Sequence, residues 1–111
     1  MTLVQLRHFV VLADKRTFVE ASTALFLTQP ALTRSIQSLE AELGAPLFDR
    51  LGRRIALTPF GREALKRARR LVSDAEALKQ AGNGLHAGLI GKLRVGLSSG
   101  PGALLSTPIE E

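Results

Sequence analysis

Apolar residues recur at helical spacing within residues 28–44, and the opposite side of the helix that they predict is polar. The apolar stripe comprises Leu32, Ile36, Leu39 and Leu43. Intervals of four, three and four residues keep these side chains on one face, which needs a core to cover it. The polar side carries Gln29, Pro30, Thr33, Arg34 and Gln37. Such side chains can meet the donors, acceptors and methyl groups of base edges in a DNA major groove, so we interpret this segment as a DNA-reading helix.

Two shorter helices are predicted upstream. Thr2 and Gln5 form a capping-box pattern that begins the first one. Its predicted inward face comprises Leu3, Leu6, Phe9, Val10 and Ala13. The same capping pattern recurs at Thr17 and Glu20 and begins a second helix, which ends near Leu25. The second helix, a short turn and the polar-faced helix together match a helix-turn-helix.

The chain after this motif predicts a β-hairpin. Gly44 can end the third helix in a left-handed conformation, and Pro46 prevents its continuation. Short strands over residues 47–50 and 54–57 flank the sequence Leu-Gly-Arg. Arginines at the tip of a hairpin that follows a helix-turn-helix predict a wing that reaches the DNA backbone. The alternative is an exposed hairpin whose arginines contribute only to solubility.

A longer amphipathic helix is predicted to begin at Thr58 and Pro59, a good cap and a good first helical residue. Its apolar residues follow the spacing of a coiled-coil seam. The seam and its flanks comprise Ala64, Leu65, Ala68, Leu71, Val72, Ala75 and Leu78. We expect this seam to pair with the same helix of a second chain and form a dimer. The alternative is that the helix folds back onto its own domain.

The coarse organisation follows from these elements. Residues 1–58 are predicted to form the winged domain and residues 59–90 a linker helix that ends in a glycine-rich hinge. Residues 92–97 alternate as a single strand would, but one strand has no sheet. We therefore expect residues 91–111 to be disordered or to borrow order from a neighbour. The predicted fold class is mainly α, a winged helix-turn-helix followed by a dimerising helix.

Charge and composition narrow the function. The chain has a net charge of +5 and a pI near 10.8, and eight Lys and Arg residues lie between Arg50 and Arg70 against one Glu. Such a concentration of positive charge suits binding to a polyanion, although a solvated helix face is the usual alternative.

The absence of cysteine excludes disulfides and thiolate metal sites, and we expect the protein to lie in the cytoplasm. No apolar run approaches the roughly 20 residues that span a bilayer.

Enzymatic chemistry is not expected. The sequence from Gly96 to Gly100 fits the G-x-S-x-G pattern of a hydrolase nucleophile, but no histidine follows it. His8 and His86 have no partners at metal-ligand spacing. We therefore predict no metal site and no cofactor within residues 1–111. We also see no pair of carboxylates placed for acid and base catalysis.

Three segments resemble a known family when they are taken together. LRHFVVLADKRTFVEAS, LTQPALTRSIQSLEAELGAPLFDR and RRIALTPFG look like the N-terminal winged helix-turn-helix of LysR-type transcriptional regulators. The resemblance covers about residues 1 to 90, and GKLRVGLSSG is similar to the first strand of the effector-binding domain that follows in that family. Residues 91–111 would then be a remnant of that domain. Ser22 stands where the family commonly has a second alanine, and Phe26-Leu27 replaces a polar-aliphatic pair.

The resemblance implies a partner and a mode of assembly. It implies a homodimer through the linker helix, often a tetramer at full length, bound to an interrupted inverted repeat in double-stranded promoter DNA. It also implies a small-molecule co-inducer for an intact protein, with Ser98 and Ser99 near its site. A molybdate-responsive regulator with a similar N-terminal domain is the alternative among DNA-binding families. A dimeric helical module that does not bind DNA is the alternative outside them.

The motif also suggests a role for individual residues. Base contacts are assigned to Gln29, Pro30, Thr33 and Arg34. Gln29 suits adenine, Arg34 suits guanine, and Pro30 or the Thr33 methyl group suits the thymine methyl. Backbone contacts, which position the protein without reading sequence, are assigned to Thr17, Thr28, Gln37, Arg53 and Arg54.

Overall fold

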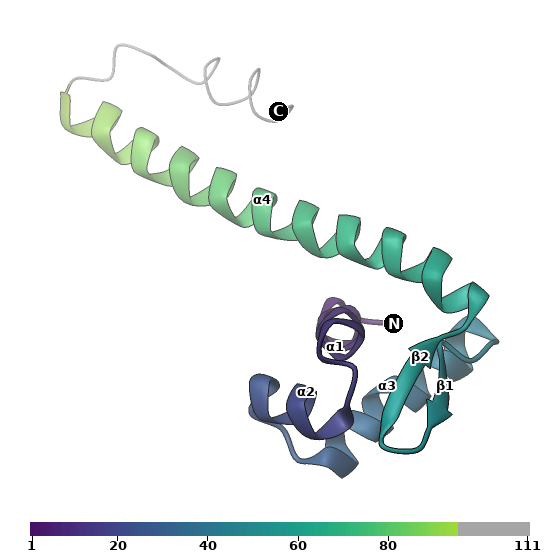
Figure 1. The fold of residues 1–111 in the computed structure, drawn as a ribbon. Helices are drawn as coiled ribbons and strands as arrows, with labels where there is room; N and C mark the ends of the chain where they lie inside the picture. The colour runs from purple at the N-terminus through teal and green to yellow at the C-terminus, as the bar shows by residue number, and fades with distance from the viewer. Residues whose placement is uncertain (96–111) are drawn as a thin grey trace. The chain divides into compact units, whose positions relative to one another are not determined.

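A computed structural model describes the backbone of residues 1–95 and the side chains of residues 1–84. Its elements are α1 (Leu3–Lys15), α2 (Phe18–Leu25), α3 (Gln29–Leu43), β1 (Phe48–Leu51), β2 (Arg54–Leu57) and α4 (Pro59–Val95). Figure 1 shows α1, α2 and α3 grouped together, with the β1–β2 hairpin beside α3. The chain divides into two compact units, Met1–Ser73 and Asp74–Glu111. The first unit is a winged helix-turn-helix that includes the first turns of α4.

The predicted helix boundaries are confirmed by their capping interactions. The Thr2 hydroxyl accepts a hydrogen bond from the Gln5 amide at 3.1 Å, while the Gln5 side chain accepts one from the Thr2 amide at 2.9 Å. Thr28 caps α3, with a proline in the first turn. Gly44 ends α3 in a left-handed conformation with φ of 84°. Since each cap satisfies backbone groups that a helix end leaves unpaired, these residues fix where α1 and α3 begin and where α3 ends.

The core of the winged domain draws on all its elements. Its buried hydrophobic residues are Leu6, Phe9, Leu12, Ala21, Leu32, Ile36, Leu39, Leu47, Ile55 and Ala68. The stripe predicted for α3 is buried, with Leu43 packed at its edge. The inward face predicted for α1 is partly wrong, because Leu12 is fully buried and Leu3 is exposed. The rings of Phe9 and Phe48 meet edge to face at 5.5 Å and join the hairpin to α1.

The junction between the hairpin and α4 is closely packed. The buried Thr58 hydroxyl accepts a hydrogen bond from the Gly61 amide and donates one to the Pro46 carbonyl, both at 2.8 Å. The Thr58 amide also donates to the Leu47 carbonyl at 3.0 Å. A Cβ atom on Gly61 would lie 2.1 Å from that carbonyl oxygen, so only glycine permits this approach of α4 to the residue before β1.

The C-terminal part of α4 differs from the prediction. Residues 82–91, which were expected to form a hinge, are helical, and the strand predicted over residues 92–97 is wrong over residues 92–95, which are also helical. The rest of that strand, the remnant domain beyond residue 95 and the predicted serines of an effector site lie outside the described residues. Glycine costs a helix only about 1 kcal/mol relative to alanine. A helix also satisfies its own backbone hydrogen bonds, whereas a lone strand does not.

Candidate nucleic-acid interface

The N-terminal half of α3 presents the polar face that the sequence predicted. Gln29, Pro30, Arg34 and Gln37 are exposed, and Thr33 is half-buried. Their spacing places them on one side of the helix, opposite the buried stripe. The Arg34 guanidinium makes no hydrogen bond or ion pair within residues 1–84. The four residues assigned to base contacts therefore share one accessible surface.

Two side-chain contacts between α1 and α3 orient this surface. His8 Nδ1 lies 2.7 Å from Ser35 Oγ, and Gln5 Nε2 donates to Ser38 Oγ at 3.2 Å. Burial lowers the pKa of His8 below its usual 6.5, which favours the neutral ring. Sequence reasoning missed these positioning residues, because their pairing requires α1 and α3 to lie side by side. Serines on the flank of an otherwise apolar stripe were the available indication.

The turn of the helix-turn-helix closes without glycine. Phe26 ends α2 in a left-handed conformation with φ of 57°, and the residue is 94% exposed. Its amide donates to the Ser22 and Thr23 carbonyls, and the Leu27 amide donates to the Ser22 carbonyl at 2.9 Å. The left-handed conformation costs a residue with a side chain about 1–2 kcal/mol. The Ser22 hydroxyl is buried but donates to the Val19 carbonyl at 3.0 Å, so the departure from alanine is accommodated.

Both threonines assigned to the DNA backbone also cap helices. The Thr28 hydroxyl accepts from the Ala31 amide at 3.2 Å, and the Thr17 hydroxyl accepts from the Glu20 amide at 3.1 Å. Thr28 is exposed and Thr17 is half-buried. A hydroxyl that accepts one hydrogen bond keeps its own hydrogen for donation, so capping leaves both residues able to bind a phosphate oxygen.

The hairpin holds the predicted wing arginines at its tip. Leu51 pairs with Arg54, so Gly52 and Arg53 form a two-residue turn. Gly52 has φ of 65°, as expected for the first central residue of a type II′ turn. Arg53 and Arg54 are exposed. Arg54 lies on the face of the hairpin opposite the buried Ile55, because neighbouring residues of a strand alternate between faces.

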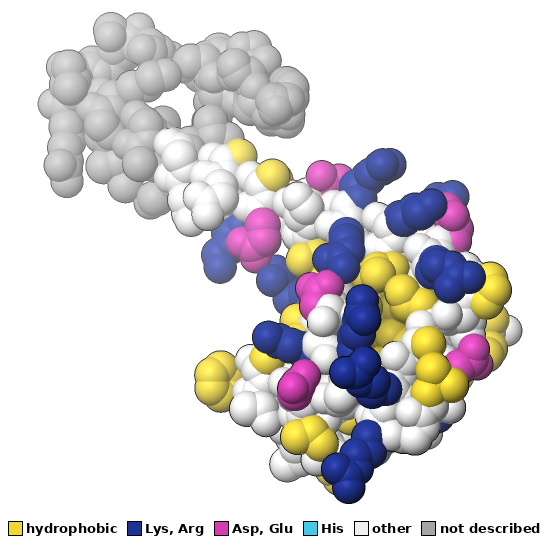
Figure 2. Space-filling view, in the orientation of Figure 1, with side chains coloured by type: hydrophobic (Ala, Val, Ile, Leu, Met, Phe, Trp, Pro, Cys, Tyr) yellow, Lys and Arg dark blue, Asp and Glu magenta, His cyan; other side chains and the backbone are white. Residues whose placement is uncertain are grey.

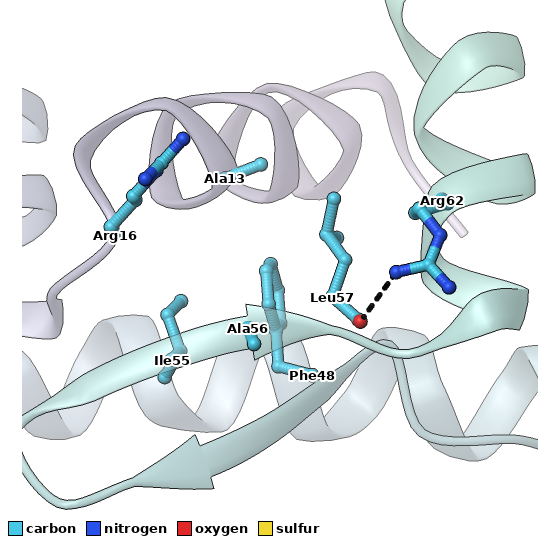
Figure 3. A pocket seen from close by; sticks show the side chains of 7 residues that line it. All are labelled: Ala13, Arg16, Phe48, Ile55, Ala56, Leu57 and Arg62. Carbon is cyan, nitrogen blue, oxygen red and sulfur yellow. Dashed lines mark hydrogen bonds between the residues drawn. The ribbon is translucent and has the colours of Figure 1, made fainter.

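Hydrogen bonds join strand β2 of the wing to α1 near its tip and to α4 at its base. The Ile55 amide donates to the Arg16 carbonyl at 3.1 Å, and the Arg62 guanidinium donates to the Leu57 carbonyl at 3.4 Å. These residues line a hollow of about 290 Å³ between α1 and β2. Figure 3 shows Arg16 and Arg62 at its opposite ends. The hydrogen bonds at both ends limit how far the wing can swing relative to α1.

The predicted dimer seam divides into two groups. Four of its members pack against the core of their own domain: Ala64, Leu65, Ala68 and Val72. Ala68 is only 2% exposed, so it lies inside the domain and not on a seam open to a partner. Leu71 and Leu78 are 49% and 74% exposed, and Ala75 is half-buried. These contacts place the first turns of α4 against their own domain, while pairing of the seam with a second chain stays a prediction.

The surface charge of the winged domain is dominated by arginine and lysine. Figure 2 shows Lys and Arg side chains in a band down the domain, with apolar side chains beside it. Two carboxylates offset part of this charge: Asp14 binds Arg69 at 2.6 Å, and Glu63 lies 3.8 Å from Lys66 and from Arg67. The wing arginines have no such partners among the described residues, so their charges remain available to a polyanion.

The described part of the chain lacks two other kinds of feature, a metal site and a membrane-spanning helix. Residues with described side chains contain no group of three His, Cys, Asp or Glu residues that could hold a metal ion. None of the described helices has the length and hydropathy needed to cross a membrane.

The family of the chain follows from a direct match. Residues 3–62 match the family described as "Bacterial regulatory helix-turn-helix protein, lysR family". The chain belongs to the LysR family. A "SDS degradation transcriptional activation protein" of Pseudomonas sp. is 48% identical over 103 residues, which cover 93% of this chain and 34% of that protein. An HTH-type transcriptional regulator of Azotobacter vinelandii is 42% identical over 98 residues, which cover 88% of this chain and 68% of that protein.

Solved structures with the same fold include complexes with DNA. The CbnR_DBD–DNA complex has a TM-score of 0.72 and 34% identity, over 76% of this chain and 97% of that one. The BenM_DBD complex with catB site 1 DNA has a TM-score of 0.76 and 34% identity, over 79% of this chain and 95% of that one. The chain thus contains the DNA-binding domain of a LysR-type transcriptional regulator, a family of regulators and not of enzymes.

Proposed function

We propose that this domain binds promoter DNA with α3 in the major groove and the wing on the sugar-phosphate backbone. Gln29 and Arg34 form hydrogen bonds to base edges, and Pro30 and the Thr33 methyl group contact thymine methyls. The observation that carries this proposal is the exposed face of α3, on which an arginine without an internal partner lies among three smaller residues suited to base edges.

Backbone contacts position the reading helix in this proposal. Thr17, Thr28 and Gln37 donate hydrogen bonds to phosphates beside the major groove, and Arg53 and Arg54 bind phosphates from the wing. Because strand β2 of the wing is hydrogen-bonded to α1 and to α4, the separation between the arginines at its tip and α3 is set before DNA binds. Binding therefore orders few additional side chains, which favours affinity.

Assembly is the second part of the proposal. Leu71, Ala75 and Leu78 recur at intervals of four and three on α4 and pair with a second copy. Leu71 also borders an apolar hollow of about 250 Å³ next to Phe60 and Ala64. The dimer binds an interrupted inverted repeat in the cytoplasm, where bacterial DNA lies. In an intact protein a small-molecule co-inducer acts through a further domain, and two dimers join as a tetramer.

The test is a titration of fluorescently labelled DNA at several salt concentrations. A duplex selected from a random pool and a scrambled duplex of equal length are compared by anisotropy. We expect at least roughly 10³-fold tighter binding to the selected duplex, and weaker binding to both as salt rises. Equal affinity for both duplexes would reject sequence reading. The absence of binding to either would reject the function.

A further inference from the structure

A small hollow separates the reading helix from the wing. It has a volume of about 160 Å³ and lies between α2, α3 and β1. Its lining comprises Phe18, Thr33, Ile36, Gln37, Glu40, Phe48 and Arg50. Thr33 and Gln37 belong to the proposed DNA-binding face, whereas Arg50 has no role in the contacts assigned above. The hollow is therefore lined by both parts of the proposed interface, and its lining includes one arginine to which no contact has been assigned.

The register of the hairpin directs Arg50 toward this hollow. Arg50 pairs with Ile55, and paired residues of an antiparallel hairpin project to the same face. Ile55 is buried, so Arg50 lies on the inward face of the wing and not on the face of Arg54. The Arg50 guanidinium carbon lies 4.7 Å from the centre of the Phe18 ring, within the range of a cation–π interaction. The aromatic ring thus holds the cation in place at the edge of the hollow.

The charge of Arg50 has no internal counterpart. Glu40 lines the same hollow, yet no ion pair joins the two within the described residues. A Glu40 carboxylate oxygen instead accepts the Leu47 amide at 2.7 Å. A guanidinium that is exposed, held by a ring and left without a carboxylate is suited to an external anion.

We propose that Arg50 binds a DNA phosphate in this hollow, with Thr33 and Gln37 as neighbouring donors and Phe18 as a positioning residue. This inference rests on the proposed function. When α3 occupies the major groove and the wing binds the backbone beside it, the sugar-phosphate strand that borders this groove must run from α3 to the wing. The hollow lies at that crossing, and its cation would fix the spacing between helix and wing.

The test combines charge removal from the protein with charge removal from the DNA. Wild type and Arg50→Ala are titrated with the selected duplex, with a scrambled duplex, and with selected duplexes that each carry one neutral methylphosphonate. We expect Arg50→Ala to weaken binding to both unmodified duplexes by roughly 10-fold. We expect the magnitude of the slope of log Kobs against log salt to fall by about 0.9 for each protomer bound, which is about 1.8 for a dimer. Within each half-site, the methylphosphonate at one position should weaken binding by wild type but not by Arg50→Ala.

Further variants separate positioning from folding. Phe18→Leu should weaken binding in the wild-type background but not in the Arg50→Ala background, and Phe18→Tyr should bind as wild type does. Lys79→Ala, which removes an exposed charge outside the winged domain, should leave the slope unchanged. An Arg50→Ala slope equal to that of wild type, or equal sensitivity of both proteins to every methylphosphonate, would overturn the inference while leaving the proposed function intact. If wild type bound none of these duplexes, the proposed function itself would be rejected.

Discussion

The contact between Gly61 and the Leu47 carbonyl sets two physical effects against each other. Alanine is a better helix former than glycine by about 0.8–1 kcal/mol, so helix propensity alone expects Gly61→Ala to stabilise the fold. The added Cβ would, however, lie 2.1 Å from the Leu47 oxygen and 3.2 Å from a Leu57 methyl carbon. The nearest atom is the backbone oxygen of Leu47, and the side chain of Leu47 is fully buried in the core. The Leu47 backbone therefore cannot move aside freely, so α4 must shift away from it.

The cost of that separation can be estimated. Overpacking of this kind costs about 1–3 kcal/mol, and weakening of the hydrogen bond from Thr58 to Leu47 costs about 0.5–1.5 kcal/mol more. After the gain in helix propensity, we expect Gly61→Ala to destabilise the domain by about 1–3 kcal/mol. For a domain of this size, that corresponds to a decrease in Tm of roughly 5–20 °C.

Urea denaturation followed by circular dichroism measures this effect. Gly82→Ala is the matched control, because a Cβ there has nothing within 4 Å and the residue is helical. We expect this control to increase helicity without lowering the urea midpoint. A Gly61→Ala protein as stable as wild type, or more stable, would refute the close approach of α4 and the wing.

Three further outcomes follow from the same structure. Arg53→Ala should weaken binding to all DNA sequences and reduce the salt slope by about one unit for each protomer bound, and an unchanged slope would remove Arg53 from the backbone contacts. Leu71→Lys should give monomers in sedimentation and weaken binding to a duplex with two half-sites, and a mutant that stays dimeric would show that Leu71 is not in the seam. Because the pKa of His8 is lowered in the fold, the unfolded chain binds the proton more readily, and stability should fall as pH drops through the usual value of 6.5. His8→Asn should flatten that decline in urea titrations between pH 7.5 and 5.5, whereas an equal decline in both proteins would exclude His8 as its source.

Local sequence patterns predicted the elements that have strong local causes. The capping box of Thr2, the glycine that ends α3 and the apolar stripe of α3 each depend on residues within one or two turns of each other. These features therefore identified the helix-turn-helix, and the arginines around Gly52 identified the wing. The same reasoning separated the polar face of α3 from its buried face.

Features that depend on packing between elements were not predictable in this way. Ala68 fits a coiled-coil seam by spacing, but the position of α4 against the core decides that it is buried. Arg50 appears in the sequence only as one charge among many, and the register of the hairpin decides that it meets Phe18. The helix over residues 92–95 was mistaken for a strand, because a short alternating pattern does not distinguish the two structures.

The central claim is that the exposed face of α3 reads bases, and Arg34 tests it most directly. Wild type and Arg34→Ala are each used to select duplexes from the same random pool, and the base preference at every position is compared. We expect Arg34→Ala to lose about 1–3 kcal/mol of discrimination at one symmetry-related pair of positions, with the other preferences retained. Identical preferences for the two proteins, with affinity reduced equally on selected and scrambled DNA, would contradict base reading by this helix.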